Sequence, residues 1–163
     1  VCSSDLTYLK AGGKDYYLHL TVDNYSRKIL GYYLTDNMQA EGSVYCLNMA
    51  MRAAGNPTGV IHHSDRGSQY RSEKFFDKAK NKYNMILSMT DGGKPYQNAI
   101  VERLNGTLKY EFGLKNNLKN YETLQKYVQN AVFIYNNYRL HASLNYSTPN
   151  VFYDSNNATY FRT

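Results

Sequence analysis

Cysteine is scarce in this 163-residue chain, which contains only Cys2 and Cys46. The two are far apart in the sequence, and neither has a partner at metal-ligand spacing, so a disulfide scaffold and a cysteine-rich zinc module are excluded. No apolar run approaches the ~18 residues that a membrane span needs, and the N-terminus lacks the pattern of a signal peptide. These absences predict a protein that has no membrane partner and works in a reducing cytoplasm.

The motifs of several enzyme classes are also missing. Neither GxxxxGK[ST] nor GxGxxG occurs, which disfavours chemistry on a nucleotide cofactor. A Ser beside a His invites comparison with hydrolases, but the GxSxG elbow is absent around Ser64. His62 and His63 have no second ligand pair at zinc spacing. We therefore expect neither a serine hydrolase nor a zinc enzyme.

Positive charge is what the sequence has in excess. The net charge is +6 and the isoelectric point about 9.2. Residues 1–64 are neutral overall, whereas residues 94–163 combine eight basic and four acidic side chains with many tyrosines. This distribution is the one expected of a protein with a polyanion partner. Composition alone, however, is better explained by a solvated basic surface on an ordinary protein.

The length suits a single domain, and the hydrophobic pattern predicts an α/β fold. Period-two alternation and turn residues predict strands at 5–9, 16–22, 28–35, 60–63 and 85–89. Helical spacing predicts helices at 40–54, 72–83, 95–112 and 121–138, followed by an irregular tail from residue 140. Three antiparallel strands followed by helix-linked strands predict a ribonuclease-H-like mixed five-stranded sheet flanked by helices.

Three acids occupy positions where this layout can bring them together. Asp5 lies in the first strand, Asp65 just after the fourth, and Glu102 inside the helix over 95–112. If the first and fourth strands are neighbours, we expect the three carboxylates to lie within ~4–8 Å of one another, a separation that two metal ions can bridge. Carboxylates this close repel unless a cation compensates them, and hard oxygen donors select Mg²⁺ or Mn²⁺. Each acid taken alone is better explained as a solvated loop or cap residue, and only the local context of the three favours a site.

The helix that carries Glu102 has one polar stripe. Asn98, Glu102, Asn105 and Lys109 follow one another at i, i+4, i+7 and i+11. Lys109 is placed to reach a DNA phosphate near the acids, although a surface lysine on an amphipathic helix has the same spacing.

Five segments of the chain match motifs of one known family. They are Asp5-Leu6-Thr7-Tyr8, the stretch 22–31 (VDNYSRKILG), the stretch 63–70 (HSDRGSQY), the stretch 88–102 that ends in Val101-Glu102, and the stretch 135–149 with Arg139 and His141. Together they resemble the integrase catalytic core of Asp-Asp-Glu transposases, specifically those of bacterial insertion sequences related to retroviral integrases. The spacing departs slightly: 36 residues separate Asp65 from Glu102, where the family usually has 35, and Gln97 stands where Asp is commoner.

The resemblance implies a site and a reaction. Asp5, Asp65 and Glu102 would be the catalytic residues and the ligands of Mg²⁺ or Mn²⁺, with two ions, whereas Asp23 would be a structural turn residue. The reaction would be phosphodiester cleavage followed by strand transfer. The partners would be transposon ends and target DNA, with a homo-oligomer as the active complex, in the bacterial cytoplasm at the nucleoid. Candidate DNA contacts are Arg66, Lys94, Asn98, Arg103, Lys109 and Arg139.

The domain prediction is a catalytic core over residues 1–150 and a C-terminal tail over 151–163. The N-terminal helix-turn-helix region usual in such transposases is not recognisable. Residues 1–6 also resemble the translation of a sequencing-library adapter, so a non-native Asp5 is an open alternative. Two functional alternatives stand beside the transposase: a non-catalytic DNA-binding remnant and a ribonuclease-H-like nuclease.

Overall fold

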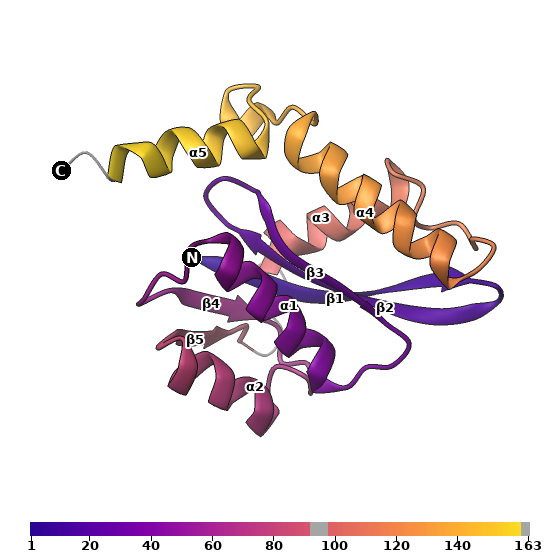
Figure 1. The fold of residues 1–163 in the computed structure, drawn as a ribbon, viewed down its shortest axis with the longest axis horizontal. Helices are drawn as coiled ribbons and strands as arrows, with labels where there is room; N and C mark the ends of the chain where they lie inside the picture. The colour runs from indigo at the N-terminus through magenta and orange to yellow at the C-terminus, as the bar shows by residue number, and fades with distance from the viewer. Residues whose placement is uncertain (92–97, 161–163) are drawn as a thin grey trace.

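The computed structural model describes residues 1–91 and 98–160 and contains one five-stranded mixed sheet (Figure 1). The strand order is β3-β2-β1-β4-β5, where β1 is Cys2–Ala11, β2 Lys14–Asp23, β3 Ile29–Thr35, β4 Ile61–Ser64 and β5 Ile86–Met89. The first three strands form an antiparallel meander, and β4 and β5 continue the sheet in parallel to β1. The predicted five-stranded layout, with the first and fourth strands as neighbours, is confirmed.

Helices cover both faces of the sheet. One face carries α1 (Ala40–Ala53) and α2 (Glu73–Asp77), which continues as a π-helical turn over Lys78–Lys82. The other face carries α3 (Ala99–Tyr110) and α4 (Tyr121–Asn137). A short 3₁₀ turn, Ala142–Leu144, leads to α5 (Pro149–Tyr160). None of the helices in the described part of the chain has the length and hydropathy of a membrane span.

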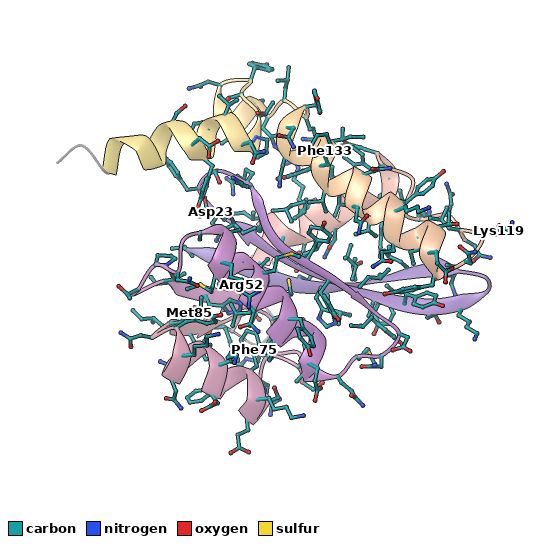
Figure 2. All side chains as sticks on the ribbon, viewed as in Figure 1. Asp23, Arg52, Phe75, Met85, Lys119 and Phe133 are labelled. Carbon is teal, nitrogen blue, oxygen red and sulfur yellow. The ribbon has the colours of Figure 1, made fainter. Side chains whose placement is uncertain are left out.

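Strand β2 shows why this sheet is buried on both faces. Its alternate residues Leu18, Leu20 and Val22 belong to the core under α3 and α4, because successive side chains of a strand point to opposite faces. The residues between them face α1 instead, where His19 hydrogen-bonds Ser43 (Nδ1···Oγ 3.0 Å). A separate cluster joins α1 and α2 to β4 and β5, with Phe75 and Met85 in it (Figure 2).

The expectation of an irregular tail from residue 140 is wrong, because α5 is a regular helix. Pro149 occupies its first position, where the fixed φ of proline suits a helix start. The Thr148 hydroxyl accepts a hydrogen bond from the backbone N–H of Val151 at 3.4 Å. Long-range contacts also hold α5, since the ring of Phe152 packs on Tyr25 at the β2–β3 turn with 5.2 Å between centroids.

Two buried histidines lie between the sheet and α1. His62 hydrogen-bonds Ser4 (Nε2···Oγ 2.9 Å), and Ser4 in turn hydrogen-bonds Thr21 (Oγ···Oγ1 2.8 Å). Burial lowers the pKa of His62 and of His19 to about 4. Both rings are therefore neutral at pH 7, and His62 is a structural group of the interior rather than a metal ligand.

Acid should unfold the protein partly through these rings. Between the unfolded pKa of about 6.5 and the folded pKa of about 4, the unfolded state binds the extra proton, so stability falls as pH falls. One such histidine contributes at most about 1.4 kcal/mol per pH unit in that window. We expect the free energy of unfolding of His19→Gln, measured with urea, to fall less between pH 7 and pH 5 than that of the wild type. An equal loss in both proteins would show that His19 is not a source of the acid sensitivity.

Candidate active site

The pairing of β1 with β4 places two of the predicted acids side by side. In this parallel register Ser4 lies opposite Ser64, and the next residue on each chain segment is an aspartate, Asp5 or Asp65. Neighbouring strands lie about 4.8 Å apart. Because the Ser4 side chain points toward α1, Asp5 points to the opposite face, under α3.

Helix α3 meets Asp5 through its polar stripe. The side-chain amide of Asn105 donates a hydrogen bond to Asp5 Oδ2 at 2.7 Å, and that of Asn98 donates to the Ser4 carbonyl at 3.3 Å. Glu102 lies between these two asparagines on the same stripe and is exposed to solvent. The stripe predicted from i, i+4 and i+7 spacing is therefore the surface that α3 presents to β1.

The Asp5 carboxyl has an unusual electrostatic environment. Its pKa is raised to about 6, mainly by burial, and the negative charges of Asp65 and Glu102 contribute to that rise. Hydrogen bonds from the Leu6 backbone N–H (2.8 Å) and from Asn105 oppose that rise. All three predicted acids thus contribute to one negative field at the carboxyl end of β4.

A tight turn fixes Asp65 beyond the end of β4. Its Oδ1 accepts a hydrogen bond from the backbone N–H of Gly67 at 2.9 Å, as aspartate does in an Asx turn. The neighbouring Arg66 is exposed, and its Nε donates to the Thr90 carbonyl at 2.8 Å. The Arg66 side chain therefore extends from the end of β4 to the end of β5, at the edge of the site.

Lys109 supplies positive charge on the same helix. Its ammonium is half-buried, which lowers its pKa, while attraction to Asp5 acts in the opposite direction. This coupling places the Lys109 charge beside the acids, where a phosphate entering the site would also lie.

The acids suit a hard divalent cation by their donor chemistry but are not drawn together. Among residues 1–91 and 98–160, no three His, Cys, Asp or Glu side chains are arranged to hold a metal ion, so the expected tight cluster is not formed. Asn105 Oδ1 is buried without a hydrogen-bond partner, which adds an unused oxygen acceptor. Carboxylate and amide oxygens are the ligands that Mg²⁺ prefers.

The other predicted DNA contacts are distributed differently. Asn98 is only 2% exposed and lies in the packing between α3 and β1. Arg103 and Arg139 line a cavity beside α3, away from Asp5. Lys94 lies outside the described residues. Asn105, which contacts Asp5 directly, was visible in the sequence only as a member of the polar stripe.

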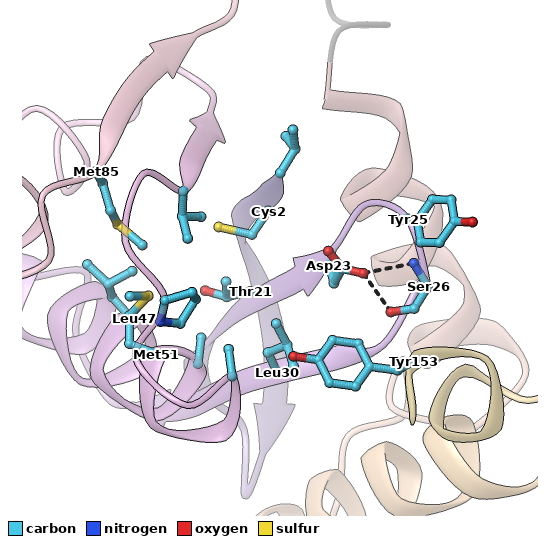
Figure 3. Close-up of a pocket in the computed structure, with 15 residues that line it drawn as sticks. Cys2, Thr21, Asp23, Tyr25, Ser26, Leu30, Leu47, Met51, Met85 and Tyr153 are labelled. Carbon is cyan, nitrogen blue, oxygen red and sulfur yellow. Dashed lines mark hydrogen bonds between the residues drawn. The ribbon is translucent and has the colours of Figure 1, made fainter. Parts of the chain in front are cut away.

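Asp23 has the structural role expected of it. Its Oδ2 accepts hydrogen bonds from the backbone N–H and the hydroxyl of Ser26, at 2.8 and 2.7 Å (Figure 3). It pairs with Cys2, three residues from Asp5 along β1, which is about 10 Å at the rise of a strand. It lines a separate cavity of about 470 Å³ between α1 and the sheet. Asp23 therefore closes the β2–β3 turn and does not join the acids.

Comparisons with known proteins agree with this geometry. Two family models described as "Integrase core domain" match residues 1–103 and residues 83–149. The transposase for insertion sequence element IS904 of Lactococcus lactis is 30% identical over 152 residues, which are 91% of this chain and 58% of the relative. Transposase InsF for insertion sequence IS3A of Escherichia coli is 31% identical over 155 residues, 94% and 54% of the two chains. The chain thus spans a little over half the length of these relatives.

Solved structures share the fold at low sequence identity. The HTLV-2 integrase catalytic core domain in complex with magnesium, in a trimeric form, superposes with a TM-score of 0.69 at 20% identity, covering 91% of each chain. A chain of the simian T-cell lymphotropic virus intasome, solved with a PP2A regulatory subunit, gives 0.72 at 23% identity and covers 86% of this chain and 49% of its own. The sheet and its helices are therefore arranged as in retroviral integrase cores.

Proposed function

Since the chain belongs to the integrase core domain family, we propose that it is the catalytic domain of an insertion-sequence DNA transposase. It would act as a metal-dependent polynucleotidyl transferase that cleaves a phosphodiester bond and joins the freed 3′ end to target DNA. The observation that carries the proposal is the placement of Asp5 in β1 beside the end of the parallel strand β4, which Asp65 follows, with Asp5 in contact with the helix that bears Glu102. The sequence similarity to the InsF transposase and the fold shared with the HTLV-2 integrase core support it.

Each residue of the site has a proposed task. Asp5, Asp65 and Glu102 would hold two Mg²⁺ or Mn²⁺ ions, which when bound polarise the phosphate and activate the attacking oxygen. Asn105 orients Asp5 through its 2.7 Å hydrogen bond. Lys109 would hold a DNA phosphate beside the acids, because its charge already interacts with Asp5.

The partners follow from the same family. Transposon ends and target DNA would be the substrates, met in the bacterial cytoplasm at the nucleoid. A homo-oligomer is the proposed active assembly, and the HTLV-2 core, which was solved in trimeric and dimeric forms, supports it. The basic C-terminal half offers the charge that DNA binding needs.

Strand transfer tests the proposed function. With Mn²⁺ and a pre-cleaved or branched DNA substrate, the wild type should form a joined product, and Asp65→Asn should not. Equal activity of Asp65→Asn would overturn the active-site assignment. Cleavage of RNA in RNA–DNA hybrids without 3′-end joining would instead indicate a nuclease, and DNA binding without any metal-dependent nicking a non-catalytic remnant.

Metal binding should be visible in thermal unfolding. Mg²⁺ at about 100 times its Kd would stabilise the folded state by about 2.7 kcal/mol, which raises Tm by about 5–10 °C at this size. Asp5→Asn should lose that gain. Without metal at pH 7.5, the Tm of Asp5→Asn should be higher than that of the wild type, because the buried Asp5 carboxylate is destabilising when ionised.

A matched control variant shows whether the effect of Mg²⁺ on Tm depends on Asp5 or on any acid of the hairpin. Asp15 is an acid paired with Lys10 at 2.8 Å, at the other end of the β1–β2 hairpin. Asp15→Asn should retain the full Mg²⁺ shift. A shift of the same size in Asp5→Asn would show that Mg²⁺ binds elsewhere.

A further inference from the structure

A second cavity, of about 620 Å³, lies beside α3 on the face that turns away from Asp5. The α3 residues that line it include Arg103 and Thr107, which on a helical wheel lie opposite Asn98 and Asn105. The remaining walls come from Arg27 at the β2–β3 turn and from the segment between Tyr135 and Ser143. These three parts of the chain are far apart in sequence. We call this space the arginine cavity.

Three guanidinium groups converge on the arginine cavity. Arg27, Arg103 and Arg139 all line it, and the positive charges of all three help burial to lower the pKa of His141 to about 4. His141 is therefore neutral at pH 7. His141 lines the same cavity as the three arginines.

A single carboxylate offsets this charge. Glu111 accepts two hydrogen bonds from Arg139, from Nε and from Nη2, each 2.8 Å long. Glu111 is also the acid whose charge acts on His141. The pair leaves Arg27 and Arg103 without a carboxylate partner among residues 1–91 and 98–160.

The two remaining arginines have unused donors. The Nη1 of Arg27 is buried and makes no hydrogen bond. Within the described part of the chain, the exposed Arg103 side chain forms neither a hydrogen bond nor an ion pair. A buried donor without a partner is costly. An anion seated in the arginine cavity would accept a hydrogen bond from Arg27 and remove that cost.

We propose that the arginine cavity binds a backbone phosphate of DNA, at a site separate from the carboxylates on the other face of α3. The inference rests on the proposed function, which supplies DNA as the partner. The planar guanidinium fork matches the oxygens of a phosphate and can contact two of them. Arg103 directly follows the exposed Glu102, so a strand that passes the acids can continue over α3 into the cavity. Helix α3 would thus be held between two contacts to the same DNA.

The salt dependence of DNA binding tests this site without any catalysis. The binding of a fluorescent DNA duplex to the wild type, to Arg27→Gln and to Arg103→Gln is measured by anisotropy in EDTA, from 50 to 200 mM salt. Each phosphate contact that is lost should lower the slope of log K against log salt by about one. The affinity at 50 mM salt should fall several-fold, equally for unrelated DNA sequences.

Two further variants serve as controls. Lys119→Gln removes a positive charge from the exposed segment before α4, far from α5 and the β2–β3 turn (Figure 2), and should leave the slope unchanged. Arg103→Lys keeps the charge and should keep the slope, although not the full affinity, because it loses the planar fork. Circular dichroism melts that match the wild type show that the variants are folded.

The contradicting results are distinct from a failure of the proposed function. Wild-type slopes in both glutamine variants, with normal DNA binding by the wild type, would overturn the cavity assignment. Inorganic phosphate that raises the Tm of the wild type but not of Arg27→Gln, with unchanged DNA slopes, would assign the cavity to free phosphate and overturn the DNA contact. If the two glutamine variants show the expected decrease in slope but the wild type performs no metal-dependent strand transfer, the phosphate site is supported and the proposed function is wrong.

Discussion

Glu102→Gln is expected to reduce metal-dependent strand transfer by at least about 1000-fold. The carboxylate is the only one of the three acids that α3 supplies, and its charge already acts on Asp5 across the site. Removing one anionic ligand from a two-metal site removes several kcal/mol of transition-state stabilisation. Product formation in single turnover, with Mn²⁺ and pre-cleaved DNA, measures the loss.

DNA binding should separate this effect from misfolding. Glu102 is exposed, and the substitution removes a negative charge from the proposed DNA-binding surface, so the affinity in EDTA should stay equal or rise. Glu122→Gln, in the first turn of α4, is the matched control and should retain full activity. If Glu102→Gln kept more than about a tenth of the wild-type rate, Glu102 would not be a metal ligand.

Gly31→Ala is expected to lower the free energy of unfolding by about 3 kcal/mol. A Cβ at Gly31 would lie 2.3 Å from the carbonyl oxygen of Cys46 and 3.0 Å from the Cβ of Ala50. The nearest atom belongs to the backbone of α1, which cannot rotate away as a side chain would. The whole helix would have to move off β3, and it would lose part of its packing with the sheet. Urea unfolding at pH 7 measures the change.

Gly106→Ala is the control with the opposite expected sign. Gly106 lies within α3, and a Cβ there would meet no atom within 4 Å. Alanine is favoured over glycine inside a helix by roughly 0.5–1 kcal/mol, so this variant should be slightly more stable than the wild type. If the free energy of unfolding of Gly31→Ala were within about 0.5 kcal/mol of the wild-type value, the close approach of α1 to β3 at Gly31 would not matter for stability.

Local sequence patterns predicted most of the architecture. Strands with period-two alternation, such as β2, and helices with one apolar stripe, such as α3, have patterns set by neighbouring residues. The same local information gave the three acids and the stripe that carries Asn105. It failed for α5, because that helix depends on contacts between Phe152 and the distant Tyr25.

The sequence by itself determined the five strands, the helices before residue 140, their order and the three acids, because these depend on residue spacing along the chain. Only the tertiary structure decided which of these groups meet. It paired Ser4 with Ser64 so that two aspartates became neighbours, and it brought Asn105 of α3 into hydrogen-bond contact with one of them, Asp5. It also gathered Arg27, Arg103 and Arg139 around one cavity, a convergence that no local pattern encodes because it joins a strand turn, a helix face and a loop.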